Sequence, residues 1–323
     1  MSHPIEALEN YNINIKDIEK LKSIGINTIQ GLYMTSRKDI LKIKGFTEKK
    51  VINIFNQANK IEVYGLFQKG SDFINERNST LKISFGFNKL DNMIGGGIES
   101  KSITEILGDK NINLSEFAHI LSIYAHKNSI DNRIIYFDLG NNFSKEKIIK
   151  LSRKLHINPN ECLKNIILMN DINSYKELMD KLNEICENNF NFKYSLIIIE
   201  SLTNIFQYLL FNETIQINTI ENKIDIESKL GQILHILKKI SILYNTAIII
   251  LRNIICNNEN SKEKNDLIKS DPNIEIILSN ECKTRLKFKK LKNNIIKCII
   301  LNSPMIPETE CKFKLNDDGI IDC

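Results

Sequence analysis

The chain has 323 residues, of which 42% are hydrophobic and 26% are charged, and its formal net charge is +5. This composition excludes a disordered or low-complexity protein, and the length allows one large domain and a small one. Seven cysteines without a C-x-x-C pair favour a reduced, intracellular protein, and neither a signal peptide nor an apolar run of membrane-spanning length is present, so no membrane partner is expected.

Apolar residues at near-helical spacing predict a small helical domain over residues 1–60. The segment 41–47, which reads LKIKGFT, lies between two predicted helices and favours a helix-hairpin-helix. Gly45 would let the hairpin turn tightly, so that backbone N–H groups at a helix N-terminus could hold a DNA phosphate. Lys49 and Lys50 would add positive charge. A small helical bundle that only packs is the alternative interpretation.

Residues 61–82 form a predicted linker, and an α/β core is predicted over residues 83–323. Near-continuous apolar runs between amphipathic helices are typical of a parallel sheet that is covered on both faces. The runs are residues 103–107, 134–137, 166–169, 196–199 and 247–251, and the clearest helix spans about 224–244. Alternating and apolar runs beyond Thr284 predict closing antiparallel strands.

The stretch from Ile103 to Ser115 has the layout of a phosphate-binding loop. Its parts are a short apolar strand, the glycine Gly108, a loop and a helical pattern that continues from Phe117. In this layout, backbone N–H groups and the helix N-terminus face an anion. A phosphate-bearing ligand is therefore the first candidate for this end of the predicted sheet.

The segment GFNKLDNMIGGGIESKSITEILG, residues 86–108, resembles the signature of the eukaryotic and archaeal RecA-like strand-exchange recombinases, and most closely the meiotic type. The C-terminal NSPMIPETECKFKLNDDGI, residues 302–320, follows the family pattern as well, so the resemblance covers nearly the whole chain. It implies a RecA-like P-loop NTPase core, ATP and Mg²⁺ as cofactors, and binding of single- and double-stranded DNA in homologous recombination and DNA repair. It further implies nuclear localisation and self-association into a filament or ring, or association with another recombinase subunit.

The nucleotide loop departs from the family's GE-x-R-T-G-K-T. Leu114 stands where the phosphate-binding lysine belongs, Asn113 replaces the glycine before it, and Ser115 keeps the hydroxyl that magnesium needs. Lys110 lies earlier on the loop and is not favoured as a substitute. By the resemblance, the degenerate nucleotide-binding residues here are Gly108, Asp109, Lys110, Asn111, Ile112, Asn113, Leu114 and Ser115.

Four further positions that the resemblance assigns to nucleotide chemistry are altered. Glu200 replaces the magnesium-binding aspartate and, with Ser115, is what remains of a metal site. Gly140 stands at the position of the catalytic glutamate, so no catalytic residue is intact. Asn253 replaces the glutamine that senses the γ-phosphate, and Asn302 replaces the aspartate that caps the neighbour's nucleotide. ATP hydrolysis is therefore expected to be lost or severely weakened.

A basic strand pair supplies the other expected DNA contacts, which are Lys283, Arg285, Lys287 and Lys289. These residues would bind phosphates with a salt-dependent affinity, and a solvated strand face is the alternative. The segments at the family's two DNA-binding loops, residues 207–214 and about 254–281, lack its basic, glycine-rich pattern. The five histidines are isolated and are assigned structural roles.

Phe67 and Gly70 match the ends of the F-x-x-A tetrapeptide by which subunits of the family join. The phenylalanine can still act as a buried anchor, although it could equally pack on its own core. Two functions follow from these observations. The first is a DNA-binding recombination protein with little or no hydrolysis, and the second is a non-catalytic accessory paralogue that binds recombinase subunits. A gene that is decaying without a role is a third interpretation.

Overall fold

A computed structural model describes residues 3–61, 74, 80–109, 111–129, 131–187, 193–202, 204–206, 220–253, 272–316 and 319–322. Phe67, Gly70, Lys110, the segment 207–214 and most of the segment 254–281 lie outside these residues. The chain divides into two compact units. The first unit consists of Met1–Ser79 and Lys181–Asn191, and the second consists of Thr80–Asp180 and Phe192–Cys323.

The first unit is helical, as its apolar spacing predicts. Its N-terminal elements are η1 (Ile5–Tyr11), α1 (Ile15–Ser23), α2 (Ile29–Met34), α3 (Arg37–Leu41) and α4 (Glu48–Ile61). Thr28 and Ser36 cap the N-termini of α2 and α3 by accepting hydrogen bonds from Gly31 and Asp39. Gly45 has a φ of 93° in the turn between α3 and α4, a conformation that favours glycine.

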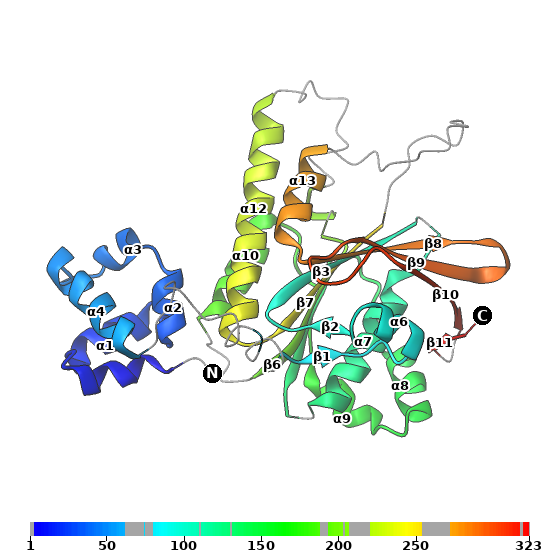
Figure 1. Cartoon of the computed structure of the whole chain (residues 1–323), viewed down its shortest axis with the longest axis horizontal. Helices are drawn as coiled ribbons and strands as arrows, with labels where there is room; N and C mark the ends of the chain where they lie inside the picture. Colours follow the sequence, from blue (N-terminus) through cyan, green and yellow to red (C-terminus); the bar gives the residue numbers. More distant parts are fainter. Residues whose placement is uncertain are drawn as a thin grey trace. The chain divides into compact units, whose positions relative to one another are not determined.

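The second unit is built on a sheet that has nine strands within the described residues, in the order β11-β10-β9-β8-β3-β7-β6-β4-β5 (Figure 1). Its strands are β3 (Ser102–Gly108), β4 (Arg133–Asp138), β5 (Ile166–Met169), β6 (Tyr194–Glu200), β7 (Ala247–Asn253), β8 (Thr284–Lys290), β9 (Ile295–Asn302), β10 (Glu310–Asn316) and β11 (Gly319–Ile321). A separate antiparallel pair joins β1 (Lys82–Ile83) to β2 (Ile98–Glu99). The α/β prediction and all five predicted core strands are confirmed.

Strand direction separates β8 from the strands that follow it. β8 runs parallel to β3, whereas β9, β10 and β11 continue the sheet in antiparallel pairs. The expected antiparallel set therefore begins at β9 and not at Thr284. β8 belongs to the parallel core because it follows the helix α13 (Pro272–Glu281), which carries the chain back to the starting edge of β3.

Helices cover both faces of the sheet (Figure 1). Ile249 and Leu251 of β7 belong to the same core as α7 (Leu114–Asn128), whereas Ile250 lies beside Leu230 of α12 (Ile220–Leu243) on the other face. The remaining helical elements are α6 (Asn88–Met93), α8 (Lys145–Lys154), α9 (Pro159–Asn165), α10 (Tyr175–Cys186) and η2 (Lys292–Asn294). Alternate side chains of one strand thus enter two cores, which explains its unbroken apolar sequence.

Candidate functional site

The strand–loop–helix from β3 to α7 is present where the sequence predicts it. β3 ends at Gly108 and α7 begins at Leu114. Asn113 is the N-cap of α7, and its side chain accepts a hydrogen bond from the backbone N–H of Ser115 at 3.2 Å. The side chain that replaces the family's glycine therefore holds one of the free N–H groups at this helix N-terminus.

Apolar side chains close the inner side of this loop. Leu114 is 3% exposed and Ile112 is 5% exposed, and both belong to the main core of the second unit. Leu114 lies so close to Gly108 that a Cβ on the glycine would be 2.9 Å from its Cγ and Cδ2 atoms. The residue at the lysine position therefore packs down on the start of the loop, where it places no positive charge.

Asn253 at the end of β7 closes the loop from the sheet side. Its Nδ2 donates to the carbonyl oxygens of Asp109 at 3.3 Å and of Ile112 at 3.0 Å. The Asp109 backbone N–H donates to Phe288 at 3.0 Å, and its carboxylate accepts from the Lys290 N–H at 3.2 Å. The structure thus brings Asn253 to the loop, as expected, but its amide bonds the loop itself.

Glu200 lies at the end of β6 in a buried hydrogen-bond network. One carboxylate oxygen accepts from Ser115 Oγ and from Asn142 Nδ2, the latter at 3.1 Å, and the other accepts from the Tyr136 hydroxyl. Burial raises the pKa of Tyr136, and the negative charge of Glu200 raises it further, so the phenol remains a proton donor. The two expected magnesium residues, Ser115 and Glu200, do meet, but they bond each other.

Gly140 is enclosed by side chains that take the place of a larger residue. A Cβ at this position would lie 2.5 Å from Asn142 Nδ2 and 3.0 Å from Ser201 Oγ. Asn142 is held from its backbone as well, because its N–H donates to the carboxylate of Asp138 at 2.9 Å. A side chain at position 140 would therefore meet Asn142, whose amide fills the adjoining space and bonds Glu200.

A cavity of about 200 Å³ lies beside the loop helix. It is lined by α7, α8 and the β10–β11 hairpin, including Glu116, His119, Lys147 and Leu315. The pKa of His119 is lowered to about 4 by burial and by the Lys147 ammonium, while Asp138 partly opposes this. His119 Nε2 accepts from the Ser144 N–H at 3.1 Å, and Nδ1 has no hydrogen-bond partner among the described residues.

Among the described residues, no cluster of three or more metal-ligating histidine, cysteine, aspartate or glutamate side chains is present. Asn302 lies at the end of β9, away from the loop, with its Nδ2 3.5 Å from the Ser279 carbonyl of α13. Sequence pattern does not identify four residues of this region, which are Glu105, His119, Tyr136 and Asn142. Glu105 offered a signal, because a charged residue inside a buried apolar strand requires partners.

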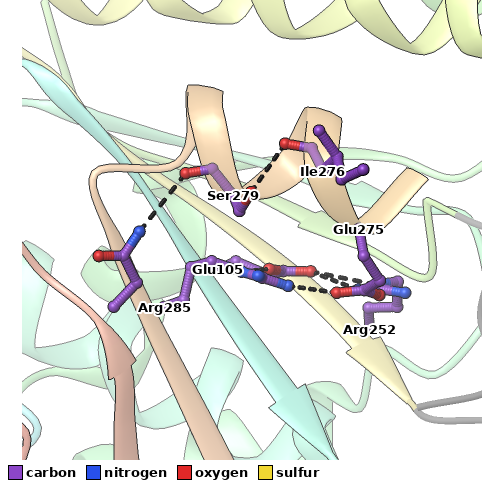
Figure 2. Close-up of polar contacts among 7 residues, drawn as sticks. Glu105, Arg252, Glu275, Ile276, Ser279 and Arg285 are labelled. Carbon is purple, nitrogen blue, oxygen red and sulfur yellow. Dashed lines mark hydrogen bonds and ion pairs between the residues drawn. The ribbon is translucent and has the colours of Figure 1, made fainter. Parts of the chain in front are cut away.

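Arg285 is not a DNA contact in this structure. Its guanidinium lies in a buried cluster with Glu105, Arg252 and Glu275, in which each arginine bonds both glutamates (Figure 2). Glu105 is 0% exposed, and it accepts from Arg252 Nη2 at 2.8 Å and from Arg285 Nε at 2.5 Å. The strand pattern suggested an exposed face, but α13 covers this end of β8 and supplies Glu275.

The predicted lysines lie in different settings. Lys50 pairs with Asp17 at 2.9 Å and Lys283 with Glu99 at 2.6 Å, whereas Lys49 and Lys289 are exposed and Lys287 is half-buried. Lys289 lies opposite Lys297 of β9, which in turn lies opposite Lys312 of β10. We call Lys289, Lys297 and Lys312 the lysine row. Like charges directly opposite one another destabilise a sheet. Lys297 also forms an ion pair with Glu310, so the exposed Lys289 and Lys312 are the members of the row that a polyanion would contact.

The described residues contain no helix that is long and apolar enough to span a membrane. A family model, Rad51, matches residues 76–323. The meiotic recombination protein DMC1 homolog A of Oryza sativa subsp. japonica is 30% identical over 98% of this chain and 90% of its own length. The human DMC1/LIM15 homolog is 28% identical over 98% of this chain and 92% of its own length. The DNA repair protein RAD51 of Saccharomyces cerevisiae is 24% identical over 99% of this chain and 78% of its own length.

Proposed function

Since the chain belongs to the Rad51 family of recombination proteins, we propose that it acts in homologous recombination and DNA repair in the nucleus, bound to DNA and without hydrolysing ATP. The observation that carries this proposal is the closed nucleotide loop, in which Leu114 packs on Gly108 and Asn253 bonds two loop carbonyls. The similarity to a relative named as a meiotic recombination protein supports a meiotic-type role.

The residues present do not fit ATP and Mg²⁺, the cofactors that the family resemblance implies. A triphosphate needs inward-facing N–H groups and a cation, and here an apolar side chain and a cap occupy those places. Magnesium needs free oxygen ligands, whereas both oxygens of Glu200 accept hydrogen bonds from the protein. At Gly140 no carboxylate can orient a water molecule.

ATP hydrolysis by the purified chain, with and without single-stranded DNA, tests this proposal. Turnover should stay at background, and a DNA-stimulated rate normal for the family would overturn the proposal. Leu114→Lys should recover some nucleotide binding but little hydrolysis, because Gly140 remains. The matched control is Leu168→Lys, which adds the same charge at an exposed leucine of β5 and should recover neither.

The lysine row and the neighbouring Lys287 support binding to the DNA backbone with little dependence on base sequence. Lys287→Glu with Lys289→Glu should weaken binding and make it less dependent on salt. Lys145→Glu with Lys176→Glu changes the net charge equally on exposed helix positions and should have a smaller effect. Fluorescence anisotropy with labelled single- and double-stranded DNA over a range of salt concentrations measures both pairs.

A non-catalytic accessory paralogue is the second candidate, and the ion pairs of Lys50 and Lys283 and the burial of Arg285 favour it. These contacts leave fewer cations for DNA than the sequence suggests. If charge reversal at Lys287 and Lys289, and separately at Lys49 and Lys50, left DNA binding unchanged, the role would rest on protein contacts. Binding to a recombinase subunit without DNA would then identify the accessory function.

A further inference from the structure

Cys298 and Cys311 face each other across two neighbouring antiparallel strands. They are directly opposite in the register of β9 and β10, so both side chains point to the same face of the sheet. The Ile300 N–H donates to the Thr309 carbonyl at 3.1 Å, two residues further along the ladder, which makes the cysteine positions a hydrogen-bonded pair. Cα atoms of such pairs are about 5.5 Å apart, inside the span of about 4.4–6.8 Å that a disulfide bridges.

The two thiols differ in exposure and acidity. Cys298 is buried in the main core, and burial raises the pKa of its thiol, with a further rise from its hydrogen bond with Cys311. Cys311 is half-buried. The hydrogen bond from Cys298 lowers the pKa of Cys311, partial burial opposes this, and the Lys89 ammonium lowers it again. The more accessible thiol is therefore the one that is more easily ionised.

We propose that Cys298 and Cys311 form a reversible disulfide when the protein meets hydrogen peroxide. The Cys311 thiolate attacks one peroxide oxygen and the O–O bond breaks, so that Cys311 becomes a sulfenic acid and the other oxygen leaves as hydroxide. The Cys298 sulfur then attacks the Cys311 sulfur, and its proton leaves with the hydroxyl as water. Both thiols are oxidised and one peroxide is reduced, so no further reactant is needed. A thiol reductant reverses the reaction.

The disulfide would join the two strands two residues before the Ile300–Thr309 hydrogen bond, beyond which the chain turns at Pro304. It would also tie together β9 and β10, which present Lys297 and Lys312 one residue away on the opposite face. A cross-link at this position therefore limits the freedom of the turn and fixes part of the lysine row. In a reducing compartment, disulfides of this kind are mostly transient and redox-sensing.

Intact-mass measurement and thiol counting on the full chain test the proposal. The starting protein carries Cys256→Ser and Cys323→Ser, which removes the two cysteines outside the described residues. After treatment with hydrogen peroxide, the mass of this protein should fall by two hydrogens and its number of reactive thiols should fall by two. A reductant should restore both values. Peptide mapping should join Cys298 to Cys311, while the buried Cys162 and Cys282 stay reduced.

Single variants separate the roles of the two sulfurs. With Cys298→Ala, Cys311 should stop at the sulfenic acid, which dimedone traps; with Cys311→Ala, Cys298 should stay reduced. The proposal would be overturned if either variant lost two hydrogen masses. It would also be overturned if Cys298 and Cys311 of the parent protein stayed reduced at peroxide concentrations that oxidise free cysteine. Differential alkylation of the parent protein gives the same answer even if a variant does not fold.

Discussion

The buried cluster of Glu105, Arg252, Glu275 and Arg285 allows a stability prediction to be worked out from the structure (Figure 2). Glu105→Gln keeps the size of a side chain that is 0% exposed but removes its charge. Two guanidinium groups would then share the single carboxylate of Glu275. Removing one partner of a buried ion pair costs about 3–5 kcal/mol, because the remaining charge is left uncompensated. We expect a loss of this size in the free energy of unfolding of the second unit.

Thermal and urea unfolding followed by circular dichroism measure this loss. At roughly 2–4 °C per kcal/mol, Tm should fall by about 10 °C. Asp322→Asn is the matched control in the same unit, because Asp322 and its partner Lys89 are both exposed and the pair lies 2.5 Å apart at the surface. Exposed pairs contribute about 0–1 kcal/mol, so the control should unfold close to the parent.

Two results would refute this reasoning. One is a loss below about 1 kcal/mol for Glu105→Gln, which would mean that the cluster does not hold α13 to the sheet. The other concerns Arg285→Gln, which should destabilise the protein as Glu105→Gln does. If Arg285→Gln instead weakened DNA binding at unchanged stability, Arg285 would be a phosphate contact after all. Lys289→Gln should leave stability unchanged, because that side chain is exposed.

Three other changes have defined outcomes. Gly108→Ala should lower the free energy of unfolding in urea by about 1–3 kcal/mol, because its Cβ meets Leu114. The double variant with Leu114→Ala should lose less than the sum of the two single losses, and additive losses would contradict the contact. His119 has its pKa lowered to about 4 in the folded state, so unfolding takes up a proton below pH 6.5 and stability should fall by about 2 kcal/mol from pH 7 to pH 5. His119→Gln should flatten that fall, and an equal slope would contradict the assignment. Phe67→Glu should dissociate any oligomer in size-exclusion chromatography, and an unchanged elution volume would mean that Phe67 is not the joint.

Sequence pattern predicted the architecture because burial leaves a periodic record. Strands buried on both faces read as unbroken apolar runs, and β6 and β7 lie where such runs predict them. The loop from Gly108 to α7 was equally predictable, since a glycine between an apolar strand and a helical pattern has few other layouts. The direction of β8 was not predictable, because alternation does not distinguish parallel from antiparallel pairing.

Single positions of the candidate site were also readable from the sequence. Leu114 has no charge for a phosphate and Gly140 has no carboxylate, whatever surrounds them. The motifs also identified the recombinase family, and the family match over residues 76–323 confirms that identification, whereas the chemistry assigned to Leu114 and Gly140 stays a prediction. What the sequence determined by itself was therefore the family and the order of the elements.

Only the tertiary structure decided which side chains contact Glu200, the loop after β3 and Glu105. Asn142 bonds Glu200 across 58 residues of sequence, Asn253 reaches the loop across more than 140, and Arg285 meets Glu105 across 180. Periodicity reports which face of an element is buried, but not which side chains meet when distant elements pack. From its strand pattern alone, Arg285 is predicted to lie on a DNA-binding face. The packing of α13 over β8 places it instead in a buried ion-pair cluster. Each charge in that cluster needs its partners because it is removed from water.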